Sequence, residues 1–297
     1  MKRKLLLLVM ALATAACAKG ASLGTPASPD ATGTPASTPV TPSPTASPGT
    51  TPVTVYYLVS GTSRVYLAPE RHKVTKTRAI AKRTLEELVH GTAQDPDHST
   101  PFPATTTINS VRIANTVATV DWSADVLTAN AGGQTEALGI QSIVYTLTEF
   151  PTITKVRFTV EGKTSGTASN GRSIEDFWGH EGLAGQPWDR DPQIEMLAPI
   201  TLWTPLDGSR SDGTLRLTGE ASTFEANVGI ILRDASGKVV KQTSTTASIG
   251  APNRGTFSVP ITFTPPASPQ TWTLEVIEDS AKDGSVVFKE TRSIRVG

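Results

Sequence analysis

Three stretches in the first half of the chain have the apolar and polar patterns of β-strands. Residues 53–59 (VTVYYLV) are rich in β-branched and aromatic residues, and residues 64–74 (RVYLAPERHKV) follow a turn at Gly61. Residues 108–123 (INSVRIANTVATVDWS) contain two alternating runs that meet near Asn115, a residue type that tolerates the positive φ of a hairpin turn. The pattern therefore predicts two strands followed by a hairpin.

Two further stretches have apolar residues at helical spacing. Residues 78–90 (RAIAKRTLEELVH) end at Gly91, an expected helix stop, and residues 135–151 (TEALGIQSIVYTLTEFP) repeat the pattern. The residues that share a helical face are Ala81, Leu85, Leu88 and Val89 in the first stretch, and Ala137, Ile140, Val144 and Leu147 in the second. Residues 154–162 (TKVRFTVEG) add another strand. This order predicts a compact α+β domain over residues 53–163, with the helices packed on one face of a small sheet.

The C-terminal region, residues 194–297, has an all-β pattern. Residues 255–263 (GTFSVPITF) and 271–279 (TWTLEVIED) alternate between apolar and polar positions, and turn signals such as DASGK and KDGS separate the runs. About seven such strands within about 100 residues predict an immunoglobulin-like sandwich. The sandwich lacks a disulfide, because Cys17 is the only cysteine of the chain.

The N-terminus has the pattern of an export signal. Lys2, Arg3 and Lys4 precede an apolar run, LLLLVMALA, which is shorter than the roughly 20 residues that span a bilayer. Small residues then lead to Cys17.

The order of these small residues resembles the lipobox of bacterial lipoprotein signal peptides, over residues 1–17. Ala15, Ala16 and Cys17 match it, whereas Thr14 stands where the family usually has Leu. The resemblance implies that Cys17 becomes the first residue of the mature chain and carries a diacylglycerol, which would anchor it firmly because two acyl chains are buried. The alternative is an ordinary secretory signal, with Cys17 left free or discarded.

Residues 18–52 are nearly all Pro, Thr, Ser, Ala and Gly. Such a composition offers almost nothing apolar to bury, so we expect a disordered linker between the anchor and the first domain.

A connector with few periodic positions spans residues 164–193 and is rich in Gly, Ser and Asn. Two interpretations remain open for its aromatic and charged residues, which include Trp178 and Trp188. They could form a glycan-stacking or metal-binding patch, or the tryptophans could pin the connector against the domains while the charges face water. The residues lack the His spacing or Cys partners of a specific metal site, so no metal is expected.

Composition excludes several classes of function. The chain has 27 Lys and Arg against 27 Asp and Glu, so no basic field suggests nucleic-acid binding. Motifs of nucleophilic, metallohydrolase and phosphate-binding sites are absent from the sequence, and the four histidines are scattered. Glu70-Arg71-His72 and Asp121-Trp122 could mark a functional surface; the alternative is that Trp122 belongs to the core and the charged residues are solvated strand ends.

Several stretches resemble known bacterial domains. VTVYYLV, LAPERHKV, LEELVHGT, INSVRIANTVATVDWS and IQSIVYTLTEFPTITKVRFTVEGK resemble the GerMN domain of sporulation and spore germination proteins. The stretch from ITLWTPLDGS through GEASTFEANV, with GTFSVPITF after it, resembles the immunoglobulin-like domain of bacterial spore germination proteins. The first resemblance implies an extracytoplasmic module that serves in envelope assembly, and it implies no catalytic residues.

We therefore expect a non-enzymatic, lipid-anchored scaffold or interaction protein on the extracytoplasmic face of the bacterial cell membrane. Its expected partners are other envelope proteins, and no cofactor is expected. The alternative is a module that binds peptidoglycan, or an accessory of a cell-wall hydrolase, in which Trp178 or Trp188 stacks on glycan.

Overall fold

The computed structural model describes residues 49–129, 132–177, 183, 185–192 and 196–297, and these lie in one compact unit that spans residues 47–297. The export signal with Cys17, residues 18–48 of the predicted linker, and Trp178 of the predicted connector lie outside the described residues.

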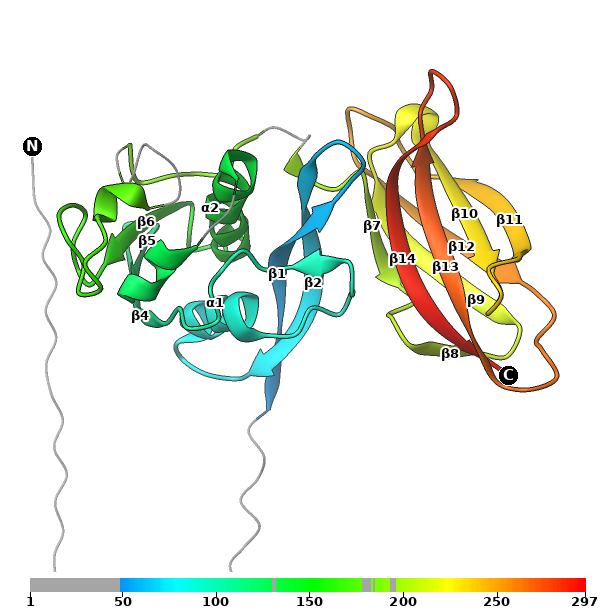
Figure 1. Ribbon diagram of the computed structural model, residues 1–297, viewed down its shortest axis with the longest axis horizontal. Helices are drawn as coiled ribbons and strands as arrows, with labels where there is room; N and C mark the ends of the chain where they lie inside the picture. The colour runs from blue at the N-terminus through cyan, green and yellow to red at the C-terminus, as the bar shows by residue number, and fades with distance from the viewer. Residues whose placement is uncertain (1–48, 130–131, 178–182, 184, 193–195) are drawn as a thin grey trace, which may run out of the picture. The chain divides into compact units, whose positions relative to one another are not determined.

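The N-terminal domain has the predicted α+β content (Figure 1). Its elements are β1 (Thr50–Ser60), β2 (Val65–Thr75), α1 (Ile80–His90), β3 (His98–Ser99), β4 (Ile108–Ala114), β5 (Val117–Trp122), η1 (Ala124–Thr128), α2 (Gly133–Thr148), β6 (Lys155–Val160) and η2 (Ile174–Asp176). The predicted hairpin turn is confirmed, since Asn115 and Thr116 have φ values of 49° and 63°. At the end of α1, a Cβ on Gly91 would lie 2.3 Å from the Glu87 carbonyl oxygen, so only glycine fits there.

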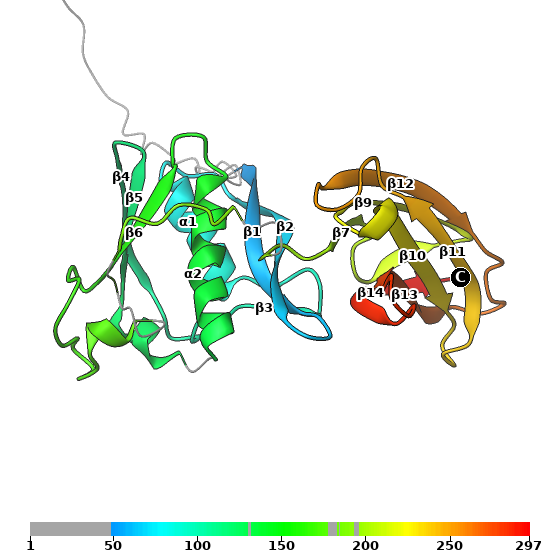
Figure 2. The ribbon, with the colours of Figure 1, turned by 90° about the horizontal axis from the view of Figure 1, so that it is seen from above.

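The arrangement of the sheets differs from the expectation. The strands form two three-stranded sheets, β2-β1-β3 and β4-β5-β6, in place of one. Helix α1 contacts β1, β2 and β4, and helix α2 contacts β1, β2 and β6, so both helices lie between the two sheets (Figure 2). Helix α2 accordingly buries residues on several sides, from Leu138 to Leu147, as expected for a helix covered by more than one layer.

Aromatic side chains fill the core of this domain. Trp122 is fully buried and stacks on Phe102, with ring centroids 5.6 Å apart, so the interpretation of Trp122 as a core residue is confirmed. The predicted connector contributes to the same core, because Ile174 and Phe177 are fully buried within it.

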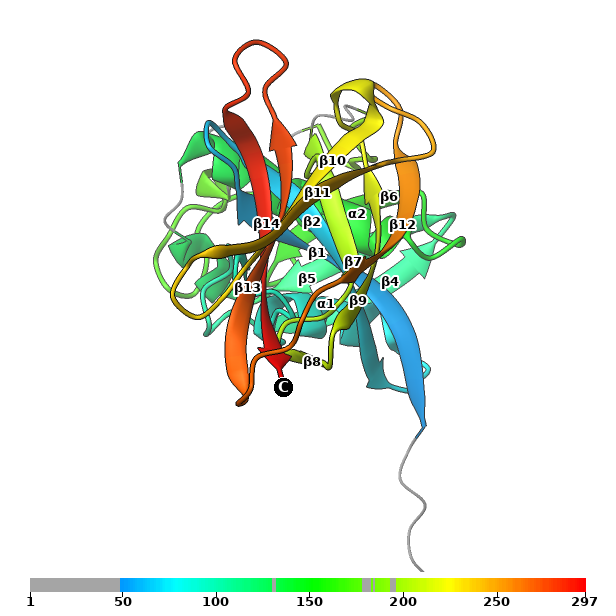
Figure 3. The ribbon, with the colours of Figure 1, turned by 90° about the vertical axis from the view of Figure 1, so that its right-hand side faces the viewer.

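The C-terminal domain is the predicted immunoglobulin-like β-sandwich (Figure 3). Its elements are β7 (Ile200–Thr204), β8 (Ser209–Ser211), β9 (Thr214–Ala221), η4 (Phe224–Ala226), β10 (Asn227–Arg233), β11 (Val239–Thr246), β12 (Gly255–Thr262), β13 (Gln270–Asp279) and β14 (Val286–Val296). They form the sheets β11-β10-β13-β14-β8 and β12-β9-β7. At Gly219, a Cβ would lie 2.4 Å from both the Phe257 ring and the Thr201 carbonyl oxygen, so glycine allows these strands to approach.

The hydrophobic core of the sandwich includes side chains from strands β1 and β2 of the N-terminal domain. Val59, Tyr66 and Ala68 belong to the same buried cluster as the sandwich strands, and the Tyr66 ring meets the Phe288 ring edge-on at 5.5 Å. The backbone N–H of Ala198 donates a 2.8 Å hydrogen bond to the Leu67 carbonyl. We call this contact region the junction.

Candidate functional site

Strand β2 brings two titratable side chains to the junction. Glu70 and His72 are only 6% and 5% exposed, so the prediction that they are solvated strand ends is wrong. They lie on the same face of β2 as Tyr66 and Ala68 because side chains alternate along a strand. Helix α1, the segment after it and the sandwich cover this face, which explains the burial.

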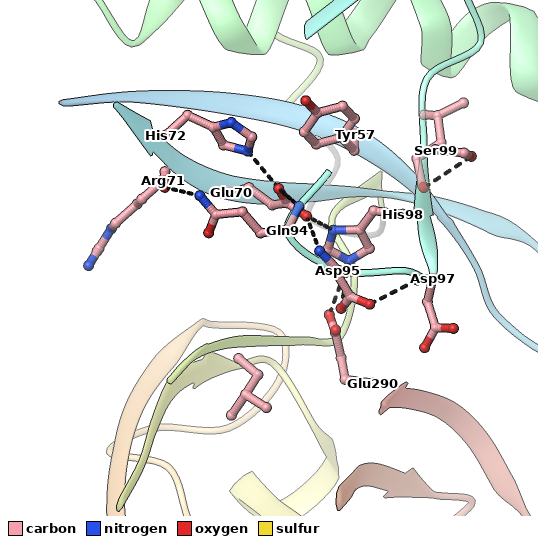
Figure 4. Close-up of polar contacts among 12 residues, drawn as sticks. Tyr57, Glu70, Arg71, His72, Gln94, Asp95, Asp97, His98, Ser99 and Glu290 are labelled. Atoms are coloured by element: carbon pink, nitrogen blue, oxygen red, sulfur yellow. Dashed lines mark hydrogen bonds and ion pairs between the residues drawn. The ribbon is translucent and has the colours of Figure 1, made fainter. Parts of the chain in front are cut away.

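The Glu70 carboxylate is the centre of a buried hydrogen-bond network (Figure 4). Its Oε2 lies 2.6 Å from His72 Nε2 and accepts a 2.8 Å bond from the Gln94 backbone N–H. Its Oε1 lies 2.7 Å from His98 Nδ1 and accepts a 3.0 Å bond from the Asp95 N–H. Four groups thus hold one carboxylate, which fixes the loop after α1 against β2.

These contacts change the pKa values of the groups involved. Burial alone would raise the pKa of the Glu70 carboxyl, but the hydrogen bonds from His72 and His98 outweigh burial and lower it to about 2. Burial alone would lower the pKa of His98, but Glu290 and Glu70 raise it to about 9. The pKa of His72 is also raised, because its hydrogen bonds to Glu70 and Glu87 outweigh burial. The network therefore favours ionised carboxylates and imidazolium rings.

Helix α1 contributes Glu87 to the edge of this network. Its Oε1 lies 3.0 Å from His72 Nδ1, and its Oε2 accepts a 3.0 Å bond from Arg83 one turn earlier. The Glu87 carbonyl oxygen also accepts a 3.1 Å bond from the Tyr57 hydroxyl. The helix is thereby tied to both β1 and β2.

Strand β14 of the sandwich supplies the opposite side of the network. Glu290 and Arg292 are 1% and 4% exposed, and Arg292 Nη1 donates to Glu290 Oε2 at 3.0 Å. Arg292 Nη1 also donates to Asp95 Oδ2, and Nη2 donates to the Leu202 carbonyl at 3.3 Å. A buried ion-pair network therefore joins the two domains.

Within the part of the chain that the structure describes, two buried nitrogens of this network have no hydrogen-bond partner, His98 Nε2 and Arg292 Nε. His98 Nε2 is buried and faces Asp95 Oδ2 at 3.5 Å and Glu290 Oε1 at 3.7 Å, both too long for hydrogen bonds. Figure 4 shows Glu290 approaching His98 and Asp95 from the sandwich. All three residues line a groove of about 510 Å³, so the atom is close to solvent-accessible space.

The mouth of the groove is formed by an aromatic and a basic residue. The Arg71 guanidinium lies 4.1 Å from the centroid of the Trp203 ring, a cation–π contact between β2 and β7. Together with the ion pairs, this contact makes the groove polar at its base and partly apolar at its edge.

Of the three residues predicted for lipidation or glycan contact, Cys17, Trp178 and Trp188, only Trp188 lies among the described residues. It is half-buried, its ring lies 5.2 Å from Phe158, and its backbone N–H and C=O bond to Val156 at 2.8 and 2.7 Å. This placement agrees with a pinning role for the connector. Cys17 and Trp178 lie outside the described residues, so their roles stay predictions.

Asp95, His98, Glu290 and Arg292 were not identified from the sequence. A signal was present in β14, where Phe288, Glu290, Arg292, Ile294 and Val296 share one parity and are all buried. Charged residues at inward positions of an otherwise apolar face indicate paired charges.

Comparison with known protein families locates both domains. Residues 54–166 match the family described as sporulation and spore germination, and residues 200–285 match the immunoglobulin-like domain of bacterial spore germination. The chain thus carries a GerMN domain followed by a spore-germination immunoglobulin-like domain. The junction network is shared between these two, since Glu70, Asp95 and His98 belong to the GerMN domain and Glu290 and Arg292 follow the matched part of the second.

Solved structures of GerMN domains are similar to this chain. The tandem GerMN domains of the sporulation protein GerM from Bacillus subtilis are 25% identical, with a TM-score of 0.38 over 48% of this chain and 46% of that chain. The first GerMN domain of the same protein is 25% identical, with a TM-score of 0.31 over 43% of this chain and 98% of that one. The chain therefore spans less than half of the tandem structure. A search of curated proteins found no match.

Proposed function

We propose that this protein is a non-enzymatic scaffold of the bacterial cell envelope, anchored by lipid on Cys17 on the extracytoplasmic face of the membrane. The observation that carries the proposal is the order of the two spore-germination domains on one chain, joined by a buried junction. A rigid pair of domains can present two binding surfaces in a fixed geometry. Among the described residues, no helix is long and apolar enough to cross a membrane.

The chemistry of the junction also favours a structural role over catalysis. Among the described residues, the hydrogen-bond partners of the His72 and His98 rings are carboxylates. A nucleophilic enzyme would place a hydroxyl or thiol beside such a ring.

Strand β11 is the surface that best suits a protein partner. It lies at the end of its sheet, where it pairs with β10, and Val239 and Val240 are 39% and 38% exposed. An exposed edge strand can accept an added strand from a partner. Lys241 is the only charged residue of β11, so there is little charge on this strand to repel an added strand from a partner.

Crosslinking in cells, followed by mass spectrometry, tests the scaffold. We expect envelope proteins to be captured by the full chain, and Val240→Lys to reduce their capture. Ile113→Lys is the matched control, because Ile113 is an exposed apolar residue on β4, an edge strand of the other domain. Recovery of the uncrosslinked protein alone would contradict the scaffold, and equal capture by the two variants would contradict the role of β11.

Two further measurements test the remaining parts of the proposal. Retention on insoluble peptidoglycan, lost on Trp178→Ala, would favour the wall-binding alternative over the scaffold. The mass of the N-terminal peptide tests the anchor, since an unmodified Cys17 in mature protein would refute lipidation.

A further inference from the structure

We propose that Asp95, His98 and Glu290 form a binding site for a divalent transition-metal ion such as Zn²⁺ at the junction. This site goes beyond the scaffold function and does not depend on it. The three residues are 1%, 8% and 1% exposed, and one ligand atom from each lies within 4.8 Å of the others. The argument rests on the unpartnered nitrogen of His98 and on the atoms that it faces.

The tautomer of His98 follows from its contact with Glu70. Both oxygens of the Glu70 carboxylate accept backbone N–H bonds, so the carboxylate acts as an acceptor toward His98 as well. His98 Nδ1, 2.7 Å from Glu70 Oε1, is therefore the donor of that bond. In the neutral ring this leaves a lone pair on Nε2, directed at Asp95 and Glu290.

One ligand atom from each of the three side chains thus lies within 4.8 Å of the other two. Nε2 lies 3.5 Å from Asp95 Oδ2 and 3.7 Å from Glu290 Oε1. A proton on Nε2 would bridge these distances poorly, because hydrogen bonds of this kind are about 2.7–3.2 Å long. Two ligands of a tetrahedral ion, each about 2.1 Å from it, lie about 3.4 Å apart, which is close to the separations seen.

The surroundings have the other properties of a metal site. A carboxylate that accepts the second ring N–H of a ligand histidine is the usual support of such a ligand, and Glu70 supplies it. Arg292 Nη1 lies against Asp95 Oδ2 and holds Glu290 Oε2, so it orients both carboxylates and leaves Glu290 Oε1 facing His98. The groove provides an entry path and room for a water as a further ligand.

The mixed donor set indicates the class of ion. Imidazole suits zinc and other first-row transition metals, whereas Ca²⁺ and Mg²⁺ prefer oxygen ligands alone. Asp95 and Glu290 carry two negative charges against the single positive charge of Arg292. On binding, the divalent ion would replace the Nε2 proton of the His98 imidazolium, so the ligand would be the neutral ring.

Zinc titration of the full chain tests the site. The chain should carry Cys17→Ser, because a thiol would bind zinc by itself. After removal of metals by a chelator, we expect calorimetry to show one equivalent of zinc bound and the unfolding temperature to rise with zinc. Cobalt in place of zinc should give d–d absorption bands of nitrogen and oxygen ligation.

His98→Gln and Glu290→Gln should each weaken zinc binding about tenfold or more. His90→Gln is the matched control, because His90 is an exposed histidine at the end of α1. Circular dichroism establishes that each variant is folded, and Glu290→Gln, which is isosteric, keeps the test valid if His98→Gln does not fold. Absence of zinc binding by the parent chain would overturn the proposal, as would binding that both variants retain.

Discussion

The ion pairs of the junction predict a large effect of removing Arg292. Its guanidinium contacts both Asp95 and Glu290, and all three side chains are at least 96% buried. Arg292→Ala leaves two buried carboxylates without this partner and removes the donor to the Leu202 carbonyl. Breaking a buried pair in this way costs about 3–5 kcal/mol, because the two carboxylates stay desolvated and, among the described residues, keep only His98, at 3.5 and 3.7 Å, as a nearby cation.

The expected loss is measurable by thermal and urea unfolding in the presence of a chelator. For a chain of this size, about 3–5 kcal/mol corresponds to a decrease of about 6–20 °C in the unfolding temperature. Arg295→Ala is the control, because Arg295 is exposed on the same strand, and it should change stability by less than about 0.5 kcal/mol.

A rescue variant separates charge from packing. Arg292→Met combined with Asp95→Asn and Glu290→Gln removes the unpaired charges and should recover much of the loss. The reasoning is refuted if Arg292→Ala and Arg295→Ala have equal unfolding temperatures, since the two carboxylates would then be solvated.

Two further predictions concern backbone space and pH. Gly91→Ala should destabilise the protein by about 1–3 kcal/mol in urea unfolding, because its Cβ would overlap the Glu87 carbonyl oxygen. Gly133→Ala in α2 is the control, since a Cβ there meets open space, and this substitution should be neutral or slightly stabilising. Equal effects of the two substitutions would contradict the steric argument. The raised pKa of His72, caused by Glu70 and Glu87, means that its contribution is complete below the unfolded pKa of about 6.5 and is lost as pH rises through the folded value. The stability difference between the parent and His72→Gln should therefore shrink from pH 6 to pH 9, and a difference that grows would contradict this sign.

The strands of the sandwich were predictable because their side chains have a period of two. Residues 255–263 alternate strictly, and β12 extends from Gly255 to Thr262. In the last strand, Glu290 and Arg292 interrupt the apolar positions of SVVFKETRSIRV, so the pattern alone does not show that they face inward. The structure has one continuous strand there, since Arg292 is an inward residue paired with buried carboxylates.

The two-sheet arrangement was not predictable from local pattern. An alternating strand such as residues 155–160 has the same signature whichever strand it joins. Here β6 pairs directly with β5 in parallel, and α2 is part of the connection between the two strands. The site was missed for a related reason. Glu70 and Glu290 are 220 positions apart, and a charged residue at a strand position reveals burial only when its partners are known.

If the chain is anchored through Cys17, as we propose, strand β1 has a mechanical consequence. It begins at Thr50, is the central strand between β2 and β3, and pairs with β2 in an unbroken register from Thr50 to Ser60. Tension that enters before Thr50 and leaves through the sandwich, whose core includes Val59 and Tyr66 at the far end of the hairpin, acts along the strand axis and shears the whole ladder at once. Pulling on this end should therefore meet a shear clamp, which would protect the domain from unravelling when its attachment is stretched.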